Sequence, residues 1–133
     1  MNTSQIILYS LLALVVLVYL RRFLLTRGIT RYSPSQLADR LKQGDVVLLD
    51  VRTPAEFHSG NIRGAVLIPL QELHRRVEDL QKYHGKELIC YCQSGSRSLM
   101  AAAQLRKKGL NAAHLEGGIA EWNFSQKTGR EDL

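Results

Sequence analysis

The sequence predicts an α/β domain with a central, mainly parallel sheet flanked by helices, preceded by one N-terminal transmembrane helix. Two observations lead to this fold class. From about residue 33 to residue 124, short apolar runs that favour strands alternate with segments patterned as helices. Such alternation is typical of a parallel sheet covered by helices on both faces. In addition, the first 25 residues are far more apolar than the rest of the chain.

The N-terminal segment carries no charged side chain from Ile6 to Leu20. This run spans only about 22 Å as a helix. A transmembrane anchor over residues 3–25 therefore requires Arg21 and Arg22 to extend to the lipid headgroups. A cleaved signal peptide is disfavoured because no basic residue precedes the run and no small-residue cleavage site follows it. A buried core helix is disfavoured because the segment is apolar on all faces.

The positive charge is concentrated beside this segment. The formal net charge is +6, yet from Tyr32 onward 14 basic side chains stand against 12 acidic ones. The excess predicts a basic linker over residues 26–33 that binds anionic lipid headgroups, and no nucleic-acid motif accompanies it. Positive charge after the span predicts a single-pass membrane protein whose C-terminal domain faces the cytoplasm. The basic residues concerned are Arg21, Arg22, Arg27 and Arg31.

Two segments carry strong helix-start signals, Ser33–Gln36 and Thr53–Glu56. Each combines an N-cap hydroxyl, a proline at the first helical position and a capping-box partner three residues after the cap. They predict helices over residues 33–42 and 54–59. Apolar runs predict strands over residues 46–49, 65–68, 88–91 and 112–115. The remaining predicted elements are helices over residues 73–83 and 98–108, a helical turn over 119–123 and a flexible tail over 125–133.

The candidate site follows the strand over residues 88–91, because ligands of parallel sheets bind beyond the carboxyl ends of the strands. Cys92 stands at this position. Backbone N–H groups of the next residues, the N-terminus of the following helix and the charge of Arg97 all favour the thiolate form. We therefore predict that Cys92 is a nucleophile with a lowered pKa. The same N–H groups and positive charge also suit the anionic sulfur of a persulfide, or an oxyanion. The loop residues are Gln93, Ser94, Gly95, Ser96 and Arg97.

Cys90 lies inside the predicted apolar strand, which indicates a buried structural cysteine, with a resolving-thiol role as the alternative. The close spacing of Cys90 and Cys92 is poor for a structural disulfide. Two cysteines without a matching Cys/His group also fall short of a zinc site. The histidines are scattered and are expected to be surface or packing residues, namely His58, His74, His84 and His114.

The segment Cys92–Ser98 resembles the C-x-x-G-x-R-S active-site loop of single-domain rhodaneses. Three further stretches resemble that family in order and spacing, and together the four cover residues 30–124. The one departure is Asn61, where the family usually has histidine, at a position expected to be structural. The three stretches are Asp50-Val51-Arg52 with Glu56-Phe57, Gly60–Ala65 with Ile68-Pro69, and Leu115–Gly118 with Trp122.

The resemblance implies a rhodanese-like domain over residues 30–124 and a sulfurtransferase activity. Cys92 would take sulfur from a small-molecule donor such as thiosulfate and pass it, as a persulfide, to cyanide, a thiol or a protein. The implied substrate-binding residues are Gln93, Ser94, Gly95, Ser96 and Arg97. Arg52 either assists them or is held in a structural ion pair. Asp50 and Glu56 are expected to support the scaffold, and no metal or organic cofactor is implied.

Two other functions remain open from the sequence. Phosphatases and arsenate reductases of the same fold have one more residue between cysteine and arginine, so their larger loop encloses a tetrahedral oxyanion. Here only Gln93–Ser96 intervene, which favours a single sulfur atom. The second alternative is a membrane-tethered binding module without catalysis. The presence of Cys92 disfavours it, since inactive members of the family commonly lack this cysteine.

Overall fold

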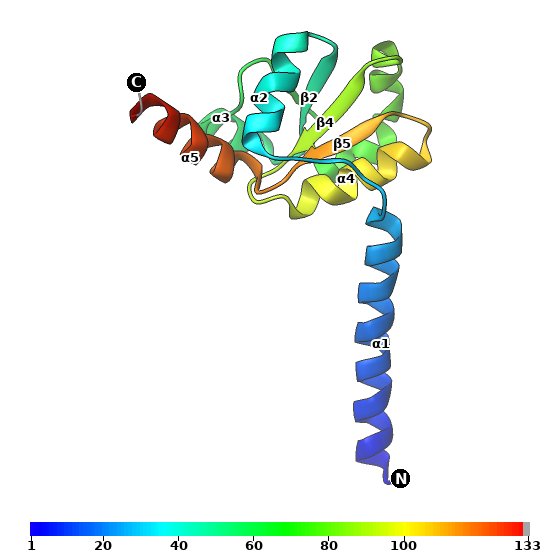
Figure 1. Ribbon diagram of the computed structural model, residues 1–133. Coiled ribbons are helices and arrows are strands. Elements are labelled where there is room, and N and C mark those ends of the chain that lie inside the picture. The colour runs from blue at the N-terminus through cyan, green and yellow to red at the C-terminus, as the bar shows by residue number, and fades with distance from the viewer. Residues whose placement is uncertain (132–133) are drawn as a thin grey trace.

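The computed structural model describes residues 1–131 and contains a long N-terminal helix followed by an α/β domain (Figure 1). The domain is built on one five-stranded sheet in the order β1-β5-β4-β2-β3, and every pairing is parallel. This architecture confirms the predicted fold class. The strands are β1 (Arg31–Tyr32), β2 (Val46–Asp50), β3 (Val66–Leu67), β4 (Glu87–Tyr91) and β5 (Ala112–Leu115).

Strand β1 was not predicted. It is only two residues long and lies inside the segment expected to be a linker, where no apolar run indicates a strand. Its pairing partner is β5, with Arg31 opposite His114 and Tyr32 opposite Leu115. The strand therefore depends on a contact distant in the chain, and it joins the end of the N-terminal segment to the edge of the sheet.

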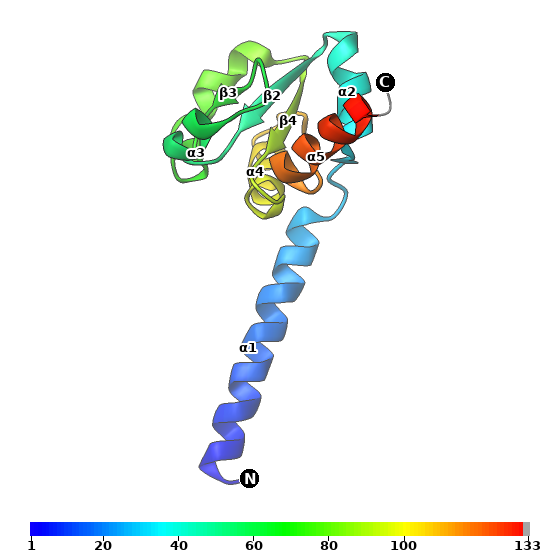
Figure 2. The same cartoon turned by 90° about the vertical axis from the view of Figure 1, so that its left-hand side faces the viewer.

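Helices cover both faces of the sheet (Figures 1 and 2). Side chains of β4 alternate between the two resulting cores, as the strand period requires. Leu88 and Cys90 pack in the core that α4, η1 and η2 contribute to, whereas Ile89 and Tyr91 pack in the core shared with α2 and α5. These elements are α2 (Pro34–Gln43), α3 (Pro54–Ser59), η1 (Leu70–Arg75), η2 (Val77–Tyr83), α4 (Ser96–Lys107) and α5 (Gly118–Glu131).

Both predicted capping boxes are present. Ser33 and Thr53 are the N-caps of α2 and α3, and each side chain accepts a hydrogen bond from the backbone N–H three residues later. In turn, the side-chain oxygens of Gln36 and Glu56 accept a hydrogen bond from the backbone N–H of Ser33 and Thr53. The starts of these two helices are therefore local features that the sequence specifies directly.

Two predicted helical segments differ from the structure. The segment 73–83 is not one α-helix, because Arg76, with φ −113° and ψ 14°, separates the 3-10 helices η1 and η2. The turn predicted to end at Asn123 continues as α5 to Glu131. No helix breaker stands between Asn123 and Gly129, which explains the extension. The predicted tail is therefore largely helical, while residues 132–133 lie outside the described part of the chain.

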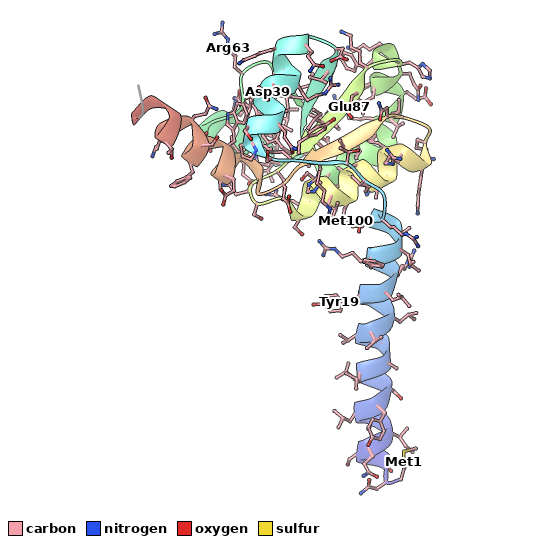
Figure 3. All side chains as sticks on the ribbon, in the orientation of Figure 1. Met1, Tyr19, Asp39, Arg63, Glu87 and Met100 are labelled. Carbon is pink, nitrogen blue, oxygen red and sulfur yellow. The ribbon has the colours of Figure 1, made fainter. Side chains whose placement is uncertain are left out.

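Helix α1 (Thr3–Thr26) projects from the domain as a single rod (Figures 1 and 2). It is long and apolar enough to cross a membrane by length and composition. Its side chains point outward all round, as Tyr19 illustrates in Figure 3, and residues 3–24 are exposed. Only the end of α1 meets the domain: Arg22 donates a hydrogen bond to Ser96, Leu25 is half-buried and Thr26 is buried.

Candidate active site

Cys92 lies directly after β4, at the carboxyl edge of the sheet. Residues 92–95 form a short turn between this strand and α4. Gly95 is the N-cap of α4 and has φ +109°, a conformation that residues with a side chain rarely adopt. A Cβ at this position would lie 3.3 Å from the backbone nitrogen of Gly117. Glycine therefore permits the sharp turn that folds the chain back over Cys92.

The sulfur of Cys92 is surrounded by hydrogen-bond donors. The backbone N–H of Gly95 donates to Sγ at 3.0 Å, and that of Ser98 donates at 3.4 Å. The hydroxyl oxygen of Ser98 lies 3.6 Å from Sγ. Burial acts to raise the pKa of the Cys92 thiol, but hydrogen bonds from Ser98, Gly95 and Ser94 outweigh it, so the pKa is lowered. The turn thus stabilises the thiolate.

Ser98 is itself held by a buried histidine of the neighbouring strand. Its Oγ lies 3.1 Å from Nδ1 of His114 and also donates to the carbonyl of Gly95 at 3.1 Å. Burial, with a smaller contribution from the charge of Arg31, lowers the pKa of His114 to about 4, so the imidazole is neutral near pH 7. Its Nε2 is buried and makes no hydrogen bond within the described chain.

Neither Ser98 nor His114 was singled out as a site residue from the sequence. Ser98 is the last position of the Cys92–Ser98 motif, and its place in that motif is the sequence signal that points to it. His114 was expected to be a packing or surface residue without a partner. Its contact with Ser98 joins β5 to α4 across 16 residues of chain, and no local pattern indicates it. The histidine is buried, as a packing residue would be, but it also contacts the site.

Arg97 is held by the carboxylate of Glu56. Its Nη1 and Nη2 donate to the two carboxylate oxygens of Glu56 at 2.7 and 2.9 Å. Arg97 lowers the pKa of Glu56 to about 2, helped by hydrogen bonds from Thr53. The expectation that Glu56 is mainly a scaffold residue therefore needs an addition, because its carboxylate fixes the guanidinium. The lowered pKa of Cys92 arises from the N–H groups and hydroxyl around it.

Arg52 forms the structural ion pair that the sequence left open. Its Nη2 donates to Oδ2 of Asp50 at 2.7 Å, and both side chains are buried. A second bond from Nη2 reaches the carbonyl of Gly60 at 2.7 Å. Nη1 lies 3.5 Å from Oε1 of Gln93, a long contact that still brings Arg52 to the edge of the Cys92 turn.

A second turn supports the first one from the side of α5. The backbone N–H groups of Ile119 and Ala120 donate to the carbonyls of Cys92 and Gln93 at 2.9 and 3.2 Å. Gly118 lies so close that a Cβ there would meet these two residues' backbone atoms at 2.5 Å. The close approach leaves no space for a side chain, so Gly118 supports the turn that carries Cys92.

The polar residues of the turn are open to solvent. Gln93, Ser94 and Ser96 are exposed, while Cys92 itself is 1% exposed. Within residues 1–131, no three His, Cys, Asp or Glu side chains gather into a group that could hold a metal ion. Cys90 is a free, fully buried thiol, and burial raises its pKa to about 12. It is therefore a packing residue in this state of the protein.

Comparisons with known proteins identify the family of the domain. Residues 33–125 match the family model of the rhodanese-like domain. A curated sulfurtransferase from Allochromatium vinosum is 38% identical over 79 residues, which cover 59% of this chain and 72% of that protein. The chain belongs to the rhodanese-like domain family. Two other curated relatives are each 40% identical over the matched region, but the chain spans a smaller part of them: 50% of an uncharacterized Synechocystis protein and 24% of a protein from Mycobacterium tuberculosis named as a probable adenylyltransferase/sulfurtransferase.

Solved structures show the same fold. A human single-domain sulfurtransferase is 30% identical with a TM-score of 0.64, and the match covers 71% of this chain and 96% of that one. A Rhodopseudomonas palustris protein of unknown function, described as a possible tyrosine phosphatase, is 26% identical with a TM-score of 0.72. That match covers 79% of this chain and 87% of the other. The fold alone therefore does not distinguish a sulfurtransferase from a phosphatase.

Proposed function

We propose that this protein is a sulfurtransferase in which Cys92 carries sulfane sulfur as a persulfide. One observation supports this proposal most strongly. The buried Cys92 sulfur accepts hydrogen bonds from the backbone N–H of Gly95 at 3.0 Å and from that of Ser98 at 3.4 Å. These donors stabilise a negative charge on the thiolate before the reaction. They are also suited to stabilise the terminal sulfur anion of a persulfide.

The proposed reaction has two displacements. The Cys92 thiolate attacks the outer sulfur of thiosulfate, a new S–S bond forms, and sulfite leaves with the electron pair of the broken S–S bond. An acceptor thiolate then attacks the outer sulfur of the persulfide and releases Cys92 as a thiolate. No net oxidation occurs in either step, and in an assay cyanide takes the place of the acceptor. The chemistry uses no metal and no organic cofactor.

The remaining predicted site residues have roles suited to an anionic donor. The N–H groups along Gln93–Arg97 bind its oxygens and the transferred sulfur. Arg97, fixed by Glu56, and Arg52, fixed by Asp50, add positive potential at the edge of the turn. Both guanidiniums already have a carboxylate partner, so we expect the backbone N–H groups to make the larger contribution to binding.

A first experiment tests this function against phosphate chemistry. The purified chain is assayed for thiocyanate formation from thiosulfate and cyanide, and for hydrolysis of p-nitrophenyl phosphate. We expect thiocyanate formation that Cys92→Ser abolishes and Cys90→Ser retains, with negligible phosphatase activity. Thiosulfate-independent hydrolysis of the phosphate ester that needs Cys92 would contradict the proposal. An inert chain in both assays would instead support a non-catalytic binding module.

We also propose that residues 3–25 anchor the protein in a membrane and that residues 26–33 are a basic juxtamembrane segment. The exposed apolar surface of α1 supports the anchor, because residues 3–24 are all exposed in the described chain. The positive charges after the span favour a cytoplasmic domain. Reporter fusions at the C-terminus test the orientation. A fusion that is active only outside the cytoplasm would overturn it.

A further inference from the structure

The end of helix α1 is part of the domain and not a free tether. Thr26 is 5% exposed, and Ile29 is 6% exposed within the main hydrophobic core. Only Arg27 and Gly28 separate these two buried residues. The Thr26 hydroxyl donates to the carbonyl of Arg22 at 2.9 Å and so closes the last turn of the helix. So short a connection between buried residues restricts how the domain can move relative to α1.

The same turn of α1 contacts the candidate site. Nη2 of Arg22 donates to Oγ of Ser96 at 3.0 Å, and α1 packs against α4. Ser96 is the first residue of α4 and stands four positions after Cys92. Figures 1 and 2 both place the β4–α4 turn and α4 on the side of the domain from which α1 leaves. Met100 of α4 lies just above the end of α1 in Figure 3.

The charge pattern of α1 sets the level of the lipid headgroups. The uncharged run ends at Leu20, and Arg21 and Arg22 follow. The helix from Thr3 to Arg22 is about 30 Å long, which matches the hydrocarbon thickness of a bilayer. Arginines at the end of a span place their guanidiniums among the headgroups. Because Arg22 is hydrogen-bonded to Ser96, the Cys92 turn lies near the level of the lipid headgroups too.

We propose that the Cys92 persulfide is presented at the membrane surface and that its acceptor is a cysteine thiol of a membrane protein, close to the headgroups. This inference rests on the proposed sulfurtransferase function and on the proposed anchor. A large soluble acceptor has to enter the space between the domain and the bilayer. A thiol on a protein of the same membrane is already confined to that layer, which raises its effective concentration at the site. Its thiolate attacks the outer persulfide sulfur, and Cys92 leaves as the thiolate.

The test uses the full chain reconstituted in vesicles and loaded with sulfur from thiosulfate. The acceptors are two transmembrane peptides that share one cysteine-containing sequence. In the first, the cysteine directly follows the span. In the second, a flexible spacer of roughly 20 Gly and Ser residues separates the cysteine from the span. Persulfide on each peptide is measured by mass spectrometry, with cyanide as a soluble control acceptor.

We expect transfer to the juxtamembrane cysteine to be roughly tenfold faster than transfer to the spaced one. A matched variant carries a flexible Gly/Ser insertion between Arg27 and Gly28, which detaches the domain from the end of α1. It should lose this preference and keep its thiocyanate formation. Equal rates for the two peptides in the wild type would overturn the inference, and so would an unchanged preference in the insertion variant.

The failure of this inference is distinguishable from that of the proposals beneath it. If thiosulfate leaves no sulfur on Cys92, the sulfurtransferase function is wrong. If alkaline carbonate extracts the chain from the vesicles, the anchor is wrong. Either result also overturns the inference. If the chain is retained and loaded but shows no preference for the juxtamembrane thiol, the inference alone is wrong.

Discussion

Arg97 and Glu56 form a two-pronged ion pair, with Nη1–Oε1 at 2.7 Å and Nη2–Oε2 at 2.9 Å. Glu56 stands in the first turn of α3 and completes its capping box, and Arg97 stands in the first turn of α4, so the pair links two helices at the edge of the Cys92 turn. The guanidinium is thereby held by a carboxylate partner at the start of α4. The electrostatics of the site consequently depend on a carboxylate as well as on a cation.

This pair predicts a stability difference that depends on pH. The pKa of Glu56 falls from 4.5 to about 2 in the folded chain. The carboxylate therefore stabilises the fold above pH 4.5, and this contribution is lost as the pH falls toward 2. Both side chains are about one-third exposed, so Glu56→Gln should cost only about 0.5–1 kcal/mol near pH 7. Urea unfolding at pH 7 and near pH 3 measures the difference, which should shrink at low pH. Glu72→Gln, in an exposed pair with Arg76, is the control, and equal costs for both variants would contradict the prediction.

Ser98 predicts the reactivity of Cys92. Its N–H and hydroxyl both act on the sulfur, and Ser98→Ala removes only the hydroxyl. A hydrogen bond to a charged group contributes about 1.5–3 kcal/mol, so the pKa of Cys92 should rise by roughly one unit or more. The alkylation rate as a function of pH, measured in a Cys90→Ala background, reports this pKa. An unchanged pH profile would show that the hydroxyl does not stabilise the thiolate.

Replacement of His114 should raise the pKa of Cys92 as well, by less than Ser98→Ala does. Its Nδ1 lies 3.1 Å from the Ser98 oxygen, which has the Gly95 carbonyl as a competing partner. His114→Leu removes the ring nitrogen that contacts the Ser98 oxygen, so the hydroxyl is held less firmly beside the Cys92 sulfur and the pKa of Cys92 should rise. In the double variant with Ser98→Ala, His114→Leu should add little, because its effect acts through the hydroxyl. Fully additive pKa shifts would contradict a role through Ser98.

The extent to which the sequence predicts this structure differs between local and distant features. The strands β2 and β4, the capping boxes at Ser33 and Thr53 and the turn after Cys92 depend on neighbouring residues, and they were predicted within one or two positions. The contacts Arg97–Glu56 and Ser98–His114 join residues 41 and 16 positions apart. Their partners become visible only once the sheet order β5-β4-β2 brings the elements together.

The irregular segments were harder for the same physical reason. Leu73 and Leu80 have the spacing of one helix face, and both are fully buried as that spacing predicts. The same apolar spacing also fits two short 3-10 helices with a break at Arg76, so periodicity alone does not separate the two structures. Strand β1 exists because β5 pairs with it, and two residues are too short a pattern to recognise.

The buried pair of Arg52 and Asp50 predicts a large loss of stability. Their side chains are 3% and 0% exposed, so removal of one partner leaves an unpaired charge in the core. Arg52→Leu should lower the free energy of unfolding by roughly 3–5 kcal/mol. Arg76→Leu, which breaks exposed ion pairs, should cost less than about 1 kcal/mol. Similar costs in chemical denaturation would contradict the buried geometry.

Gly118 predicts a further structural requirement of the site. A methyl group there would meet the backbone of Cys92 and Gln93 at 2.5 Å. Gly118→Ala should therefore displace the turn and lower both stability and thiocyanate formation. Gly129→Ala is the matched control on the same helix, where a Cβ meets nothing within 4 Å. This variant should leave activity unchanged and raise stability by about 0.5–1 kcal/mol at most. Full activity of Gly118→Ala would contradict the close approach.

The most direct test of the central claim is the intact mass of the protein after incubation with thiosulfate and removal of excess reagent. The wild type and Cys90→Ala should each gain the mass of one sulfur atom, and cyanide should remove it. Cys92→Ala should gain nothing, although its folded structure is retained by circular dichroism. A wild-type mass that does not change, or a sulfur that remains on the Cys92→Ala variant, would contradict a persulfide carried by Cys92.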